Sequence, residues 1–375
     1  MTSLDDLAGR LAREQATALT IDWGPARIDL RSSSGPALDW ARQCFAAAGP
    51  PDPAAVPVPA AVVADDALAR QLAGRCTVPM ADADGVPVWS GELDGIPLTR
   101  PVTRAWPQFL VFGLLPGGQW YAVTSEDSLG ARAAEILARQ LLERYLRGLD
   151  ATVMHASGCV LDGRAVLFTG DGGRGKTTLA TWGAARLGGQ FLSGDRAGVY
   201  LRDAVPFAVG FAQSTRYRGG TLRRLLGGDQ WLSQLPLPGR NRMMGVGKTG
   251  QVTSGPFKVV LNNAELAALG IPAVAAAPLM GVVILADPDR APEPGSGTGR
   301  GSGVAQVTAA AAAGELHAQL RTRWDLLPGG QPGEHADPIG PNGPLERVPV
   351  LRARWRPGQD EPGEVLDAVL ACLSP

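Results

Sequence analysis

A glycine-rich stretch in the middle of the chain places the tightest constraint on its fold. Residues 170–177 read Gly-Asp-Gly-Gly-Arg-Gly-Lys-Thr and satisfy the pattern GxxxxGK[ST] in full. A good buried strand, 165–169, precedes it directly, and a plausible helix, 177–187, follows it and ends at Gly188-Gly189. Strand, loop and helix together predict a nucleotide-binding loop. The alternative is a glycine-rich turn that only resembles one.

Each part of this loop has a physical role in the prediction. Glycines let the backbone curl so that successive N–H groups point at phosphates. Lys176 supplies positive charge to the β- and γ-phosphates, and the Thr177 hydroxyl can ligate Mg²⁺. A helix that starts here directs the positive end of its dipole at the anion. The predicted nucleotide-binding residues are Gly170, Asp171, Gly172, Gly173, Arg174, Gly175, Lys176, Thr177 and Thr178.

The strand before the loop is expected to belong to a hairpin. Residues 153–161 read as a strand, and Asp162-Gly163 is a strong two-residue hairpin turn. The strand that feeds the loop would then run antiparallel to its predecessor, unlike the parallel βαβ arrangement of ordinary P-loop proteins. His155 would lie at the far end of the hairpin from the turn, close to Gly170. It is either a structural histidine or a functional one.

Polar residues follow the predicted helix. A short apolar strand, 190–193, ends at Gly194-Asp195-Arg196. A carboxylate is needed near this point to complete the Mg²⁺ shell, so Asp195 is a candidate ligand, with a turn aspartate as the alternative. Arg196 either offsets phosphate charge or forms an exposed ion pair.

Two basic segments have open interpretations. The string 245–249, Gly-Val-Gly-Lys-Thr, has Arg242 where the leading glycine should be, and no strand precedes it. With Arg240, Arg242 and Lys248 it is either a cationic lid over phosphate or substrate, or a solvated basic loop. A second cluster either binds an acidic or phosphorylated acceptor or is a solvated helix face; it consists of Arg216, Arg218, Arg223 and Arg224, with Thr215 and Thr221.

The chain of 375 residues is long enough for two domains. We predict an N-terminal lobe at 1–128 and a nucleotide-binding domain at 129–375, with a flexible Gly/Pro-rich insertion at about 291–303. Local patterns predict further elements: strands 109–114 and 120–123 around a turn at 116–118, an irregular connector within 49–64, a helix at 130–149 with Arg132, Glu135, Arg139, Glu143 and Arg147 facing outward, an Ala-rich helix at 308–323, a strand at 348–355 and a helix at 362–373.

Composition excludes several classes of function. A net charge of −1 from 35 basic and 36 acidic residues gives no global argument for nucleic-acid or membrane partners. We do not expect the acidic N-terminus to be a signal peptide, and no run approaches the ~18 apolar residues of a membrane span. We therefore expect a soluble, cytoplasmic protein. The four scattered cysteines are either reduced core thiols or two disulfides, and with three histidines a Cys/His metal cluster is not expected.

Three stretches together resemble the bacterial HPr kinase family, whose nucleotide fold is related to phosphoenolpyruvate carboxykinase. They are MHASGCVLDGRAVLFTGDGGRGKTTLA, GGQFLSGDRAGVY, and GPFKVVLNNAELAAL followed by APLMGVVILAD. The resemblance covers roughly residues 131–287, and the closing VPVLRARW strand also looks like the family's C-terminal strand. It implies an α/β fold of α+β character: an HPr-kinase/PEP-carboxykinase-like P-loop core with a mixed sheet, plus a smaller N-terminal α+β lobe.

The resemblance also implies roles for individual residues. The family's loop lysine and hydroxyl residue, which hold ATP and metal, correspond to Lys176 and Thr177, and the histidine of its preceding strand corresponds to His155. The family carries two adjacent aspartates after the helix, one for metal and one as base. Here the first is Gly194, and only Asp195 remains. Either Asp195 or His155 takes the base role, or another residue supplies it, or the protein binds nucleotide without transfer.

These expectations describe an ATP- and Mg²⁺-dependent phosphotransferase with catalytic residues Asp195, His155 and Lys176 and metal ligands Thr177 and Asp195. Divergent relatives act as tailoring kinases on ribosomally made peptides, which implies a peptide or protein hydroxyl, or a small-molecule hydroxyl, as acceptor. The main alternative is a nucleotide-binding partner of a peptide-modifying system that is not a kinase. A carboxykinase-type decarboxylation is a more distant alternative. Family members often form hexamers, which leaves a homo-oligomer open.

Overall fold

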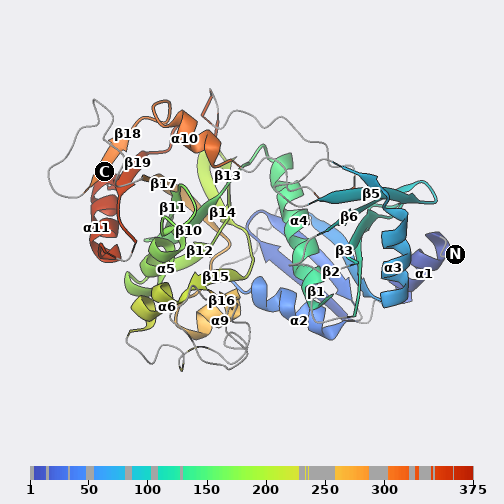
Figure 1. Cartoon of the computed structure of the whole chain (residues 1–375). Coiled ribbons are helices and arrows are strands. Elements are labelled where there is room, and N and C mark those ends of the chain that lie inside the picture. The colour runs from blue at the N-terminus through green and yellow to red at the C-terminus, as the bar shows by residue number, and fades with distance from the viewer. Residues whose placement is uncertain are drawn as a thin grey trace. The chain divides into compact units, whose positions relative to one another are not determined.

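The chain folds into two compact units of mixed α/β structure, the first built from residues 1–45, 50–148 and 321–334 and the second from 46–49, 149–320 and 335–375 (Figure 1). The predicted α/β class with mixed sheets is confirmed. The computed structural model describes residues 4–13, 17–32, 34–47, 55–80, 87–102, 109–126, 130–227, 233, 235, 258–286, 303–320, 326–328, 339–340, 343–357 and 359–374. The basic string at 245–249 with Arg240 and Arg242, and the insertion up to residue 302, lie outside these ranges.

The first unit is an eight-stranded sheet in the order β1-β2-β3-β8-β7-β6-β5-β4. The central strand β3 is parallel to both neighbours, and the other pairs are antiparallel. Helices α2 and α4 pack on one face, and α1 and α3 on the other. The elements are α1 Leu4–Arg13, β1 Thr17–Trp23, β2 Ala26–Ser32, α2 Gly35–Cys44, β3 Pro57–Ala64, α3 Asp66–Arg75, β4 Val78–Pro79, β5 Val88–Leu93, β6 Ile96–Pro101, β7 Val111–Leu114, β8 Trp120–Thr124 and α4 Ala133–Gly148, which follows a 3-10 turn at Gly130–Arg132.

Strand β3 corrects the predicted irregular connector at 49–64. Two prolines, Pro57 and Pro59, suggested a break, but the run 60–64 is apolar and mostly buried. Both prolines pair only with β2, and β8 joins β3 from Ala60 onward. A missing N–H is tolerated there because β3 has a single strand neighbour over these residues. The hairpin β7–β8 around the turn at 116–118 is confirmed.

Helix α4 forms where the apolar stripe predicts a helix. It packs in the first unit, whereas the predicted domain boundary at residue 128 assigns it to the nucleotide-binding domain. Its charged residues are also not outward: Glu135, Arg139 and Glu143 are buried. Arg139 pairs with Glu135 at 3.3 Å, and Arg147 pairs with Glu143 at 3.1 Å. Ion pairs one helical turn apart therefore let this helix bury a charged face.

A short C-terminal segment completes the first unit. The Leu326 N–H donates to the Gln140 side-chain oxygen at 2.9 Å, and Arg144 donates to the Pro328 carbonyl at 3.1 Å. Thr99 donates its hydroxyl proton to the Leu326 carbonyl. The chain thus returns to this unit after it has built most of the second.

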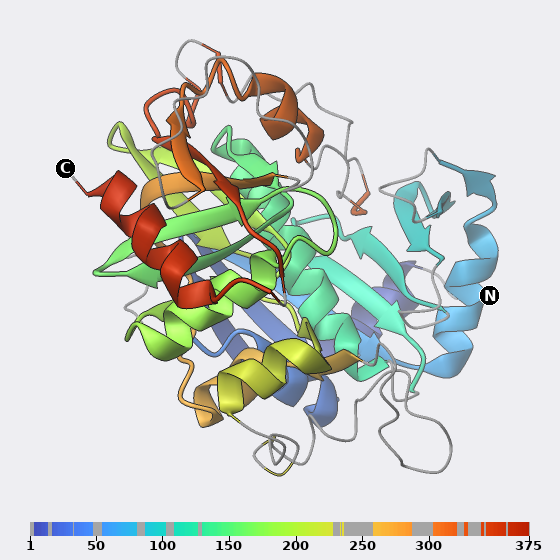
Figure 2. The ribbon, with the colours of Figure 1, turned by 60° about the vertical axis from the view of Figure 1, so that its left-hand side comes forward.

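The second unit is built on a sheet in the order β12-β10-β11-β17-β14-β13-β9, with β19 beside β17 and β18 beside β19. The long strand β17 pairs with β14 at its start and runs parallel to β11 and β19 further on. Helices α5 and α11 lie side by side over one face (Figure 2). The elements are β9 Thr152–Met154, β10 Ala156–Leu161, β11 Arg164–Thr169, α5 Lys176–Arg186, β12 Gln190–Ser193, β13 Ala197–Arg202, β14 Val205–Gly210, β15 Thr215–Arg218, α6 Gly219–Leu226, β16 Lys258–Leu261, α9 Asn263–Ala268, β17 Ala276–Ala286, β18 Val304–Val307, α10 Ala313–Ala318, β19 Val350–Arg354 and α11 Pro362–Leu373.

Several local predictions in this unit are confirmed. Asp162 and Gly163 adopt φ of 49° and 75°, and the strands on either side pair antiparallel. Strand β12 and helix α11 occupy the predicted positions. The Ala-rich helix predicted at 308–323 is shorter, because turns occupy 309–312 and only Ala313–Ala318 is α-helical in the described part.

Two further expectations concern the state of the cysteines and the presence of a membrane span. All four cysteines are free thiols, three of them buried, as the reduced alternative predicts. Among the described helices, none combines the length and apolar character that a membrane crossing needs.

Candidate nucleotide-binding site

The glycines of the loop are required by its geometry. Gly170, Gly173 and Gly175 have φ of 126°, 84° and 81°, values that side chains rarely adopt. A Cβ on Gly170 would lie 2.8 Å from the Leu285 carbonyl oxygen of β17. The loop therefore packs tightly against the neighbouring parallel strand, in the position that the sequence pattern predicts.

Trp355, just beyond β19, supports the loop from the C-terminal part of the chain. Its indole N–H donates to the Arg174 carbonyl at 2.6 Å, and its ring would collide with any Cβ on Gly175, at 2.2 Å. The side chain is 1% exposed. Sequence analysis did not single out this residue, because nothing local connects it with the loop.

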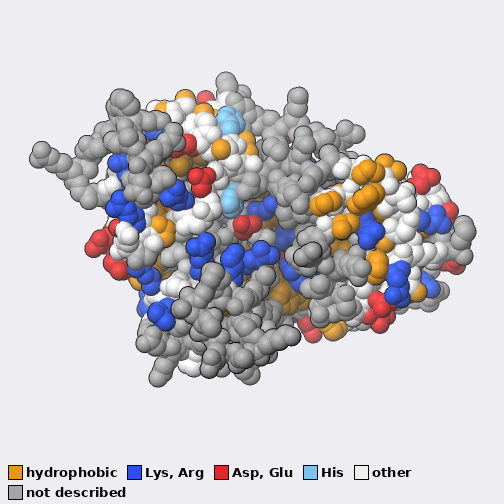
Figure 3. Space-filling view, viewed as in Figure 1, with side chains coloured by type: hydrophobic (Ala, Val, Ile, Leu, Met, Phe, Trp, Pro, Cys, Tyr) orange, Lys and Arg blue, Asp and Glu red, His pale blue; other side chains and the backbone are white. Residues whose placement is uncertain are grey.

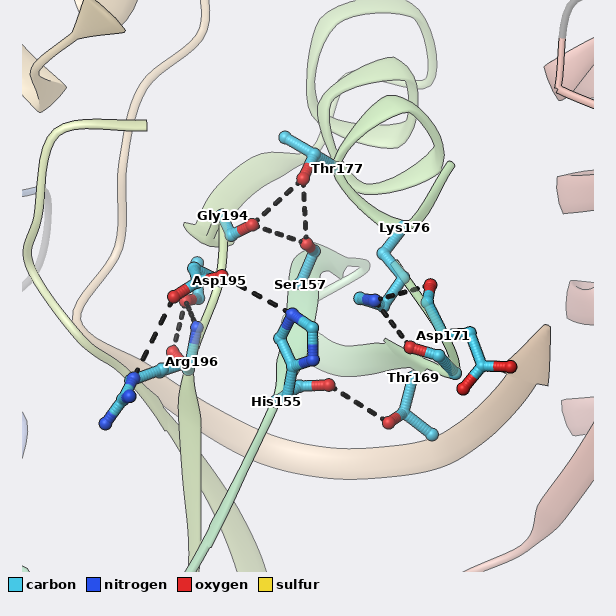
Figure 4. Close-up of polar contacts among 11 residues, drawn as sticks. His155, Ser157, Thr169, Asp171, Lys176, Thr177, Gly194, Asp195 and Arg196 are labelled. Atoms are coloured by element: carbon cyan, nitrogen blue, oxygen red, sulfur yellow. Dashed lines mark hydrogen bonds and ion pairs between the residues drawn. The ribbon is translucent and has the colours of Figure 1, made fainter. Parts of the chain in front are cut away.

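Lys176 begins α5 and is buried, and its side chain turns back over the loop (Figure 4). Its ammonium donates to the carbonyls of Gly170 at 2.5 Å and Asp171 at 3.0 Å. These contacts hold a positive charge beside the loop. Phosphate oxygens entering the loop could replace the carbonyls as acceptors.

Three oxygen atoms meet beside the first turn of α5. The Thr177 hydroxyl lies 2.9 Å from the Gly194 carbonyl oxygen, and the Ser157 hydroxyl lies 2.7 Å from the same atom. The two hydroxyls are 3.1 Å apart. Helix α5, strand β10 and the end of β12 each supply one member. Sequence analysis missed Ser157, although its spacing of two from His155 places both on one face of an extended chain.

His155 lies where the chain passes from one part of the sheet to another. The predicted continuous strand at 153–161 is wrong at this residue, because β9 pairs with β13 whereas β10 pairs with β11 and β12. The His155 backbone is held on both sides: its N–H donates to the Gln319 carbonyl at 2.8 Å, and its carbonyl accepts from Thr169 at 3.0 Å. This break fixes the imidazole beside the start of the loop.

Asp195 faces the imidazole of His155 from the end of β12. Its Oδ1 lies 3.4 Å from His155 Nε2, and its Oδ2 lies 3.8 Å from Arg196 Nε (Figure 4). Partial burial by itself would raise the pKa of Asp195, but the hydrogen bond from His155, together with Arg196 and Gln213, holds that pKa well below its usual range. The carboxylate is 54% exposed and ionised at neutral pH.

Gly194 has no room for a side chain. A Cβ there would lie 2.5 Å from both the Oγ1 and the Cγ2 of Thr215, which starts β15. Thr215 itself is buried. The space that a second carboxylate would need at this position is therefore filled by the threonine, and Asp195 is the one carboxylate on this turn.

The two predicted metal ligands belong to adjoining groups. Thr177 contacts Ser157 and the Gly194 carbonyl, whereas Asp195, the next residue, turns to His155 and Arg196. Within the described ranges no three His, Cys, Asp or Glu side chains gather as a metal cluster. Hydroxyl and carboxylate oxygens with few protein ligands suit Mg²⁺, which is usually held by one or two carboxylates plus substrate phosphates. The residues present therefore fit this ion.

The cluster of four arginines divides into two kinds. Arg224 of α6 donates to the Asp360 carbonyl at 3.2 Å and ties α6 to the chain before α11. Arg216 and Arg218 project from the exposed face of β15, and Arg223 is exposed on α6. Thr221 and Thr178 share a hydrogen bond of 3.0 Å, which fastens α6 to the first turn of α5.

Comparisons with known proteins add little to this geometry. No protein-family model and no curated protein matches the chain. Among solved structures, it is similar to an HPr(Ser) kinase/phosphatase from Coxiella burnetii, with 13% identity over 59% of this chain and 92% of that one, at a TM-score of 0.30. A similarity at this level assigns no function, so the proposal below depends on the residues of the site.

Proposed function

We propose that the second unit binds ATP with Mg²⁺ and transfers its γ-phosphoryl group to a hydroxyl. One observation carries the proposal: the loop residues Lys176 and Thr177 adjoin the His155–Asp195 pair through Gly194, whose carbonyl accepts from Thr177. A phosphate-binding loop is thereby joined to a pair of groups that can handle a proton. Phosphoryl transfer needs these two components in one place.

The binding roles follow from position. The backbone N–H groups of 170–177 and the Lys176 ammonium would hold the phosphates, since both offer positive charge at the start of α5. Thr177, Ser157 and Asp195 would hold Mg²⁺. This ion, when bound, offsets negative charge on the phosphate oxygens.

The proton of the acceptor hydroxyl would pass to His155 rather than to Asp195. The lowered pKa of Asp195 makes its carboxylate a weak base at neutral pH. An imidazole is the side chain best suited to exchanging a proton near neutral pH. Because Asp195 accepts from Nε2, it would fix the tautomer that leaves Nδ1 as the proton acceptor.

The acceptor remains an expectation from the family resemblance. A serine or threonine of a peptide or protein, in a pathway that modifies ribosomally made peptides, is the first class to test. A small-molecule hydroxyl is the second.

A second candidate, nucleotide binding without transfer, is favoured by one observation. Thr215 fills the space beside Gly194, so the turn after β12 carries a single carboxylate. A protein with this site could act as the nucleotide-gated partner of a modifying enzyme.

Binding is tested first, by calorimetric titration of ATP with Mg²⁺. We expect Lys176→Ala to weaken ATP binding by about 10- to 100-fold, since a charge-assisted hydrogen bond to phosphate contributes roughly 1.5–3 kcal/mol. Arg164→Gln is the matched control, because Arg164 is an exposed cation at the turn end of the β10–β11 hairpin. Equal affinity in wild type and Lys176→Ala would rule out the loop as the nucleotide site, on which both candidate functions depend.

Transfer is then measured with γ-labelled ATP and peptides encoded beside the gene. We expect label on a peptide hydroxyl in wild type and a loss of about 10²-fold or more in His155→Gln and Asp195→Asn. Tight ATP binding with no transfer, and no ATP hydrolysis sensitive to Asp195→Asn, would favour the second candidate.

A further inference from the structure

The two-stranded sheet β15–β16 has one apolar face and one cationic face. Tyr217, Val259 and Leu261 are buried in the core of the second unit. Arg216, Arg218 and Lys258, which alternate with them along the strands, are exposed. The strand period of two therefore presents three cations on one side, here called the cationic face.

The register of this sheet brings like charges together. Arg218 lies directly opposite Lys258, and Arg216 follows two residues along the same strand. Like charges opposite each other destabilise a strand pair. No described residue forms an ion pair with any of these three side chains. Such a face gains stability when an anion binds to it.

The cationic face adjoins the phosphate loop. The Arg218 guanidinium lies 3.7 Å from the position of a Cβ on Gly173, in the middle of the loop. The hydrogen bond between Thr178 and Thr221 holds the β15–α6 corner against α5. In the space-filling view, Lys and Arg side chains gather over the region of β15 (Figure 3).

We propose that the cationic face is a second phosphate-binding site, next to the one in the loop. Arginine suits this role because its planar guanidinium binds two phosphate oxygens at once. The anion is a phosphate group beyond those in the loop: either the terminal phosphate of the nucleotide or a phosphate on a separate molecule. This inference rests on the proposed nucleotide site, since Arg218 reaches that loop.

The test uses three probes on the full chain by calorimetry: ADP, a non-hydrolysable ATP analogue, and inorganic phosphate added to protein that is loaded with this analogue. The variants are Arg218→Gln, Arg216→Gln and Lys258→Gln, with Arg164→Gln as control for the loss of one positive charge. ADP affinity reports whether each variant keeps an intact loop.

Two results support the site and identify its phosphate. Analogue binding at least tenfold weaker in Arg218→Gln, with ADP binding unchanged, means that the face holds the nucleotide's terminal phosphate. If wild type loaded with the analogue binds inorganic phosphate and the variants do not, the face holds a phosphate from another molecule.

Unchanged affinities for the analogue and for phosphate in all three variants would overturn the inference and leave the nucleotide site standing. If wild type binds no ADP, the nucleotide site fails. In that case, loss of phosphate binding to the nucleotide-free protein in Arg218→Gln would still support the cationic face, and no such loss would overturn it.

Discussion

Charged side chains gather in two places in this protein, along α4 in the first unit and around the glycine-rich loop at 170–177 in the second, and their surroundings differ. The α4 carboxylates of Glu135 and Glu143 are 0% and 1% exposed, and each pairs with an arginine one helical turn away. Glu135 also accepts from the Trp40 indole at 3.0 Å. In contrast, the Asp195 carboxylate is 54% exposed and faces a histidine.

The difference separates charges that support the fold from charges that can do chemistry. A buried carboxylate with its arginine and indole donors has no access to a substrate, and its removal leaves buried positive charge behind. A half-exposed carboxylate beside an imidazole can meet a ligand, and its removal costs little stability. Substitutions in the two places should therefore affect different measurements.

The largest effect on stability is expected for Glu135→Ala. Breaking a buried ion pair costs about 3–5 kcal/mol, because Arg139 loses a carboxylate inside the protein. Denaturant unfolding should show this loss, with nucleotide affinity per folded molecule unchanged. Arg42→Gln is the control, since Arg42 pairs with Asp39 on the surface and should change stability by less than about 1 kcal/mol. Equal losses in the two variants would contradict the comparison.

The next largest effect is expected for Gly194→Ala. The added methyl group would overlap Thr215, and overpacking of this kind costs about 1–3 kcal/mol. The double variant with Thr215→Ala should recover most of the loss, because it removes the two atoms at 2.5 Å. Gly314→Ala, in open space on α10, serves as control. Failure of the double variant to recover stability would show that Thr215 is not the obstacle.

A smaller effect is expected for Trp355→Phe. The ring still packs on Gly175, but the Arg174 carbonyl loses its donor, a change of about 1 kcal/mol or roughly fivefold in ATP affinity. Trp182→Phe makes the same chemical change on α5 away from the loop and should leave affinity unchanged. A matching loss in both variants would mean that the Trp355 hydrogen bond does not support the loop.

The smallest effect concerns pH. Because folding lowers the pKa of Asp195, its contribution to stability is complete above the ordinary aspartate pKa of about 4 and is lost as pH falls through the lower folded value. The stability difference between wild type and Asp195→Asn should therefore shrink as pH falls below about 4. Unfolding curves at pH 7, 5 and 3 measure it. A difference that stays unchanged from pH 5 to pH 3 would contradict the lowered pKa.

Local chemistry made much of the second unit predictable. The Asp162-Gly163 turn fixed a hairpin, and the glycine pattern with its flanking strand and helix fixed the loop, since each signal depends only on neighbouring residues. The charges of α4 were misread because helical periodicity says which residues share a face, and not whether that face meets water. Strand β3 was not predicted because it contains two prolines. They are tolerated because β8 pairs with β3 only from Ala60 onward, so β3 has one strand neighbour beside the prolines.

The site shows the same limit. Lys176, Thr177, His155 and Asp195 could be predicted as site residues because they belong to short patterns. Thr215 and Trp355 are distant in the sequence from the residues that they contact at the site. Strand pairing and packing bring them there, and a local sequence pattern does not predict such contacts. Ser157 was within reach of sequence reasoning and was overlooked.

The position of Trp355 has a consequence for biosynthesis. The loop at 170–177 is supported by a side chain 181 residues beyond Arg174, close to the C-terminal end of the sequence. A chain still growing on the ribosome can pair β10 with β11, but it lacks the indole that holds Arg174. Under the proposed function, full affinity for nucleotide is therefore acquired only after β19 and Trp355 have emerged, and a nascent chain that lacks them would bind ATP more weakly.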